Sequence, residues 1–287
     1  MRTSAGAVSA GALTFLIASV LVALVAAGAV AALAALLAVP SRMDALSGLV
    51  DNAWWFVYRP AADAAAGAAA WRIGAAVAAA AVSLAAAPRI RSAYRRTPSP
   101  VIPFLMMFLL SLGVECLRSA AALLAAGDGS VSLSVFLTRV IYWGRFVGLL
   151  GLLLAGLYAL ELKYARAMVL GGAVLLIALA MAAYIPVDRT VFLAQLTWKL
   201  GDEQSVWFLN LALAVLTVLT AAVSALVHRG RRTTLLTAGI TLCVVARELE
   251  FFALRPLPLA GGLAAQVLGT VLFLKLFSAG ADSVQGR

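Results

Sequence analysis

The stretch that decides the fold runs from Val101 to Glu161 and reads VIPFLMMFLLSLGVECLRSAAALLAAGDGSVSLSVFLTRVIYWGRFVGLLGLLLAGLYALE. It consists of two long apolar segments joined by a short turn, Gly127–Ser130. Each segment exceeds the roughly 20 apolar residues that a membrane-spanning helix needs. Four charges fall at the depth of a bilayer core: Glu115, Arg118, Arg139 and Arg145. Each costs at least ~2.5 kcal/mol there unless it is paired or hydrated, so the stretch predicts a bundle whose other helices supply partners.

The composition of the whole chain agrees with this prediction. Of the 287 residues, 64% are hydrophobic and 12% are charged, whereas soluble domains are about 45–50% apolar and about 25% charged. We therefore expect one integral membrane domain covering residues 1–287. The net charge of +10 is accounted for by the Lys and Arg excess that membrane proteins carry in cytoplasmic loops, and no nucleic-acid partner is expected.

Apolar segments recur along the chain and predict an all-α, polytopic bundle of about eight transmembrane helices. The first is roughly twice as long as the apolar region of a cleaved signal peptide, so we expect it to be retained. The connection at 187–205 carries several charges and is expected to be a loop. The eight segments are Gly11–Val39, Ala61–Ala87, Val101–Ala126, Val131–Leu160, Ala167–Ile185, Val206–Val227, Thr233–Leu254 and Leu259–Phe277.

The distribution of Lys and Arg predicts the orientation of this bundle. The even-numbered connections and the two termini together hold 11 of them, and the odd-numbered connections hold 5. Membrane proteins concentrate Lys and Arg on the cytoplasmic side. Both termini are therefore expected in the cytoplasm, with the chain in the inner (plasma) membrane and lipid as its surroundings.

A second charged run lies in a later apolar segment and could pair with the first. It reads Arg247-Glu248-Leu249-Glu250. With the predicted orientation, three helices bring seven charges to similar depths in the outer half, and Arg72 is a further candidate. Tyr142 shares a helical face with Arg145. The candidate ligand-binding residues are Glu115, Arg118, Arg139, Tyr142, Arg145, Arg247, Glu248 and Glu250.

The arginine surplus in this set suits an anion, because guanidinium groups bind carboxylates and phosphates in a bidentate manner. This favours a receptor or transporter site for a small or lipid-linked anion, such as a lipid headgroup. The inner half of the bundle is poor in polar residues, which favours a receptor over a carrier. A salt-bridge network that only fixes the helix register is the competing interpretation.

Two other functions stay open from the sequence. One is an intramembrane enzyme acting on a lipid or lipid-anchored substrate, with Cys116 or Glu248 and Glu250 as reactive groups. The pairing of Cys116 with Arg118 resembles the exosortase type of intramembrane cysteine transpeptidase, but the glycine expected shortly after that cysteine and an accompanying histidine are absent. The other is a non-catalytic subunit that binds a membrane or cytoplasmic protein partner, or anionic lipid, through its basic loops.

Motifs for common catalytic chemistry are missing from the chain. It contains no G-x-S-x-G, Walker or H-E-x-x-H sequence, and His228 is its one histidine. We therefore expect no metal and no cofactor.

Two further patterns are expected to serve packing. The G-x-x-x-G of Gly144 and Gly148 is expected to allow close helix contact within the bundle, with a dimer face as the alternative. Asn210, Thr217 and Ser224 recur every seventh position and are expected to form hydrogen bonds between helices, with the lining of a path as the alternative.

Overall fold

The computed structural model describes residues 62–96, 99–126, 130–160, 167–193, 195–253 and 255–285 as continuous stretches, with isolated residues between 27 and 51. The predicted first span, Gly11–Val39, lies outside these stretches. The described residues of each of the other seven predicted spans are mostly helical. The helices are α3 (Ala62–Arg96), α4 (Val101–Glu115), α5 (Leu117–Ala126), α6 (Val131–Ala159), α7 (Ala167–Tyr184), α8 (Glu203–Val227), α9 (Arg231–Phe252) and α10 (Pro256–Gln285).

Five of the described helical stretches are long and apolar enough to cross a membrane. They lie in α3, in α4 with α5, in α6, in α8 and in α10. The helix α7 is apolar but shorter, and α9 carries Arg231, Arg232, Arg247, Glu248 and Glu250 within its 22 residues. The fold is thus mostly helical and of membrane-protein character. The expected number of eight spans goes beyond what these helices establish.

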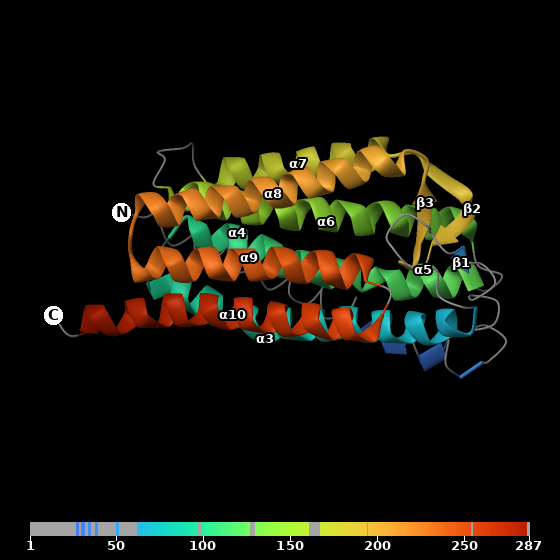
Figure 1. The fold of residues 1–287 in the computed structure, drawn as a ribbon, viewed down its shortest axis with the longest axis horizontal. Coiled ribbons are helices and arrows are strands. Elements are labelled where there is room, and N and C mark those ends of the chain that lie inside the picture. Colours follow the sequence, from blue (N-terminus) through green and yellow to red (C-terminus); the bar gives the residue numbers. More distant parts are fainter. Residues whose placement is uncertain are drawn as a thin grey trace, which may run out of the picture.

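The helices form an elongated bundle in which α3, α6, α8 and α10 run in one direction and α4 with α5, α7 and α9 run in the other (Figure 1). Helix α6 packs against α4, α7 and α8, while α9 packs against α8 and α10. Helix α3 completes the bundle through contacts with α4 and α10. This arrangement brings the second half of α4, the middle of α6 and the second half of α9 together, and these are the segments that carry the intramembrane charges.

The connection expected to be a loop at 187–205 is instead largely a β-hairpin. Strands β2 (Val187–Leu193) and β3 (Thr197–Leu200) pair in antiparallel fashion, and β1 (Val50–Asp51) runs parallel to β2. Valine, threonine, phenylalanine and tryptophan favour strands, and the charged residues between them concealed this pattern. The hairpin lies at one end of the bundle, beside α5 (Figure 1). We call this the hairpin end.

Trp198 attaches the hairpin to the start of α6. Its ring Nε1–H donates to Ser134 Oγ at 2.8 Å, and its backbone N–H donates to Thr138 Oγ1 at 3.2 Å. Ser134 and Thr138 are four residues apart and therefore lie on one face of α6. Phe192 meets the Trp198 ring edge-on at 5.2 Å. The hairpin is thus held against the bundle by hydrogen bonds as well as by apolar packing.

The half of the bundle away from the hairpin has an apolar core. Phe104, Phe108, Leu152, Ile240 and Phe273 are fully buried in it. The predicted close packing around the glycines of α6 is confirmed here, because a Cβ added at Gly144 would lie 2.8 Å from Val114, and one added at Gly151 would lie 3.0 Å from the carbonyl oxygen of Phe104. Helices α4 and α6 therefore approach each other closely along most of their length.

Candidate functional site

Glu115 lies at the centre of the charged cluster. It is the last residue of α4. A single residue, Cys116, separates α4 from α5, and its backbone N–H donates to the carbonyl oxygen of Gly113. The Glu115 carboxylate contacts the guanidinium of Arg118 one turn further along, and Arg247 Nη2 lies 2.7 Å from its Oε1. All three side chains are at most 3% exposed. One carboxylate thus joins α4, α5 and α9.

Arg247 crosses from α9 into the contact between α4 and α6. Its Nη1 donates to Ser111 Oγ at 2.9 Å, and its Nη2 donates to the carbonyl oxygen of Gly144 at 3.1 Å. A Cβ added at Gly148 would lie 2.1 Å from Nη1 and 2.4 Å from Ser111 Oγ. The second glycine of the G-x-x-x-G therefore provides the space that this guanidinium fills.

Arg145 forms a second group with Glu248 and Asn210. Its Nη2 is 2.6 Å from Glu248 Oε2, and its Nε donates to Asn210 Oδ1 at 2.9 Å. Asn210 Nδ2 in turn donates to Glu248 Oε2 at 2.9 Å. The expected hydrogen bonding between helices is confirmed for Asn210, whereas Thr217 donates to Leu213 within its own helix. The Arg145 guanidinium also lies 4.1 Å from the centre of the Phe251 ring, a cation–π distance.

Three arginines donate to backbone carbonyl oxygens near the C-terminal end of α9. Arg145 reaches the oxygen of Arg247 at 3.5 Å, Arg118 that of Glu250 at 3.4 Å, and Arg72 that of Ala253 at 2.6 Å. Carbonyls in the last turn of a helix lack partners within the helix and carry partial negative charge. The end of α9 therefore offsets part of the positive charge by which the four buried arginines exceed the three nearby glutamates.

The structure brings most of the predicted site residues together. Glu115, Arg118, Arg145, Arg247 and Glu248 are joined by ion pairs, and Tyr142 packs edge-on against Phe251. Glu250 is 5% exposed, and its carboxylate forms no ion pair among the described residues. Within the same part of the chain, its Oε1 has no hydrogen-bond partner.

Arg139 is not brought into the cluster. It is exposed on α6, while Thr138, Tyr142 and Arg145 are buried. An α-helix turns by about 100° per residue, so residue 139 points well away from the face that carries 138, 142 and 145. The prediction grouped Arg139 with the other charges by its depth in the membrane alone. It was wrong because the Arg139 side chain points away from the cluster. Arg72 takes its place as the fourth buried arginine.

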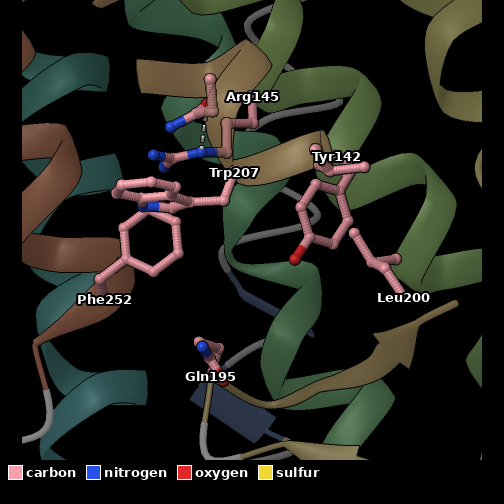
Figure 2. Close-up of a pocket in the computed structure, with 8 residues that line it drawn as sticks. Tyr142, Arg145, Gln195, Leu200, Trp207 and Phe252 are labelled. Atoms are coloured by element: carbon pink, nitrogen blue, oxygen red, sulfur yellow. Dashed lines mark hydrogen bonds between the residues drawn. The ribbon is translucent and has the colours of Figure 1, made fainter. Parts of the chain in front are cut away.

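A small pocket lies between the hairpin and the Arg145 group (Figure 2). Its volume of about 10 Å³ is close to the minimum for one water molecule. Arg145, Asn210 and Tyr142 belong to both the cluster and the pocket, and Glu248 beside them keeps 27% of its side chain exposed. Arg145 and Asn210 therefore contact both the Glu248 carboxylate and the pocket. Its lining residues are Tyr142, Arg145, Gln195, Leu200, Val206, Trp207, Asn210 and Phe252.

The two thiols lie away from this pocket. Cys116 is 1% exposed and its Sγ donates to the carbonyl oxygen of Ala76 at 3.3 Å, while Cys243 is fully buried. In the part of the chain that the structure describes, no group of three or more His, Cys, Asp and Glu side chains is placed to hold a metal ion.

The sequence could not reveal Gln195 and Trp207 as pocket residues, because both come from the region expected to be a loop or from its border. Phe251 and Phe252 follow directly after the charged run, and that adjacency was a usable signal for cation–π contact.

Fold and site together define a class: a helical bundle of membrane-protein character with a buried Arg/Glu cluster. Comparisons with protein-family models, curated proteins and solved structures find no match for this chain.

Proposed function

We propose that the protein is a multi-pass plasma-membrane receptor, with cytoplasmic termini, that binds a small or lipid-linked anion at Arg145. The observation that supports this most is that Arg145 belongs to both the ion-pair cluster and the pocket. Its carboxylate partner is also the exposed one: Glu248 is 27% exposed, compared with 3% for Glu115. An anion arriving at the hairpin end would meet this pair first.

Binding by exchange is the mechanism that this geometry favours. Glu248 can rotate outward more easily than the buried Glu115, because 27% of its side chain is already exposed. An incoming anion would then accept hydrogen bonds from Arg145 Nη2 and Asn210 Nδ2, the two donors that hold Glu248. Replacing one carboxylate by another anion keeps the buried guanidinium paired, which avoids the desolvation penalty of an isolated charge.

The rest of the cluster supports a receptor better than a carrier. Glu115, Arg118 and Arg247 are paired and almost fully buried. Among the described residues, the half of the bundle beyond them buries no charged side chain, and its mainly apolar core contains only hydroxyl groups such as those of Thr217, Thr220 and Ser224. A carrier needs polar groups through both halves so that its substrate can leave on the opposite side. The charged cluster supplies them only on the side of the pocket.

Thermal unfolding in detergent tests this proposal. Wild type, Arg145→Gln and the exposed control Arg139→Gln are measured alone, with acetate or inorganic phosphate, and with phosphatidylglycerol in mixed micelles. A ligand present at 100 times its dissociation constant stabilises the folded state by about 2.7 kcal/mol. We expect at least one probe to stabilise wild type and Arg139→Gln but not Arg145→Gln.

The two sources of anion give different results in this assay. Stabilisation by acetate or phosphate indicates a free small anion, and stabilisation by phosphatidylglycerol alone indicates a lipid headgroup. Equal stabilisation of Arg145→Gln and wild type would show that the anion binds elsewhere. Absence of stabilisation by every probe would leave the cluster as a scaffold only.

A further inference from the structure

Gln195 occupies the turn between β2 and β3, at the part of the hairpin that faces the pocket. Leu196 follows it with φ of 62°, and its backbone N–H donates to the carbonyl oxygen of Leu193 at 2.9 Å. A positive φ is unusual for leucine, and strain of this kind persists only where surrounding structure fixes it. Here the buried Leu196 side chain packs with Phe192 and Trp198. Packing therefore fixes Leu196, the residue directly after Gln195.

The Gln195 side chain ends in a buried acceptor that has no partner. The residue is 7% exposed and lines the pocket, yet its Oε1 receives no hydrogen bond from the residues that the structure describes. Buried polar atoms are nearly always hydrogen-bonded, and one without a partner calls for an explanation such as a bound molecule. Figure 2 shows Gln195 on the opposite side of the pocket from Arg145. A molecule between them would meet a cation at one end and an acceptor at the other.

The size of the site further restricts which molecules could bind between Arg145 and Gln195. The space available is that vacated by the Glu248 carboxylate together with the water-sized pocket. The donors that hold Glu248 are a guanidinium and an amide, which match a flat carboxylate. The rings of Trp207 and Phe252 and the Leu200 side chain line the space between the two ends, and they suit a short carbon chain.

We propose that Gln195 is a specificity-determining residue and that the ligand is a short carboxylic acid carrying an O–H or N–H donor, namely a hydroxy acid or an amino acid. This inference rests on the proposed function, because it assumes that Arg145 binds the carboxylate. The acid's donor satisfies Gln195 Oε1, which no protein group reaches in the described structure.

Matched pairs of acids test the inference. Acetate and glycolate differ by one hydroxyl group, as do butyrate and 4-hydroxybutyrate, so the two pairs sample two distances from carboxylate to donor. Affinities come from the concentration dependence of thermal stabilisation in detergent. One neutral hydrogen bond corresponds to roughly a 2- to 10-fold difference in affinity. We expect the hydroxylated acid of at least one pair to bind wild type more tightly by this factor.

Three variants show whether Gln195 recognises the hydroxyl group of the acid. Gln195→Met keeps the length of the side chain and removes the amide, so it should bind both acids of a pair equally, with the affinity of wild type for the plain acid. Gln195→Asn shortens the side chain by one methylene group and should also lose the preference for the hydroxylated acid. Two independent variants are used so that a folding defect in one of them does not decide the result. Gln204→Met changes an exposed glutamine at the start of α8 and should retain the preference.

The possible failures are distinguishable. If the acids stabilise wild type but the members of each pair bind equally, or if both Gln195 variants keep the preference, Gln195 is not the specificity residue and the carboxylate site at Arg145 stands. If none of the four acids stabilises wild type, the hydroxy-acid inference is overturned. The proposed function then depends on the phosphate and phosphatidylglycerol measurements.

Discussion

Replacing Gly148 by alanine tests whether Arg247 lies where the structure places it. The added methyl group would come within 2.1 Å of Arg247 Nη1 and 2.4 Å of Ser111 Oγ. Both distances are far below van der Waals contact, so the guanidinium must move. Arg247 is fully buried, and moving it breaks its bonds to Ser111 and to the Gly144 carbonyl and disturbs its ion pair with Glu115.

The size of the effect follows from two opposing contributions. Breaking a buried ion pair typically costs about 3–5 kcal/mol, while replacing glycine by alanine within a helix contributes about 1 kcal/mol of stability. We therefore expect Gly148→Ala to lower the free energy of unfolding by about 2–4 kcal/mol. The measurement is denaturant-induced unfolding in detergent micelles, followed by far-UV circular dichroism.

Gly172→Ala on α7 is the matched control. A Cβ added there meets no atom within 4 Å, so this variant should be as stable as wild type or up to about 1 kcal/mol more stable. If Gly148→Ala behaves like Gly172→Ala, Arg247 does not occupy the space beside Gly148, and the way the cluster joins α4, α6 and α9 is different from that described.

Three further predictions concern the cluster, the hairpin and the orientation. Glu115→Gln and Arg247→Gln should each cost about 3–5 kcal/mol of stability, and the double variant should cost clearly less than their sum; strict additivity in this cycle would show that the two groups do not interact. Trp198→Phe removes the ring N–H and should cost about 1 kcal/mol, measured by the same unfolding assay, and an unchanged stability would mean that this hydrogen bond does not hold the hairpin. For the orientation, a membrane-impermeant thiol reagent added to intact cells should label Gln204→Cys and spare Gly230→Cys, and the reverse pattern would place the hairpin end in the cytoplasm.

Hydrophobic periodicity and length predicted the helices well, because a lipid-facing helix needs a long apolar run and the chain shows its ends through charged or proline-containing connections. The hairpin escaped prediction for a physical reason. Its strands are short, and Asp188, Arg189 and Lys199 interrupt the apolar alternation that identifies a strand. Its stability depends on contacts with Ser134 and Thr138, which are distant in sequence.

Most residues of the candidate site could be predicted from the sequence, but the contacts between them could not. A buried charge needs a partner, and that rule alone brought Glu115, Arg145 and Arg247 into one group. It could not separate Arg139 from them, since depth was estimated without the direction of each side chain. The rule also ignored backbone carbonyl groups as hydrogen-bond acceptors. The carbonyl oxygens near the end of α9 accept hydrogen bonds from three arginines, and the composition alone had suggested that these donors were available for an anion.

Native mass spectrometry of the protein purified in mild detergent tests most directly whether Arg145 holds an anion. We expect wild type and Arg139→Gln to retain an acidic molecule that Arg145→Gln lacks, and its mass distinguishes a small acid from an anionic lipid. Equal retention of that molecule by Arg145→Gln, or wild type free of any acidic molecule even after incubation with the acids and lipid tested for stabilisation, would contradict an anion site at Arg145.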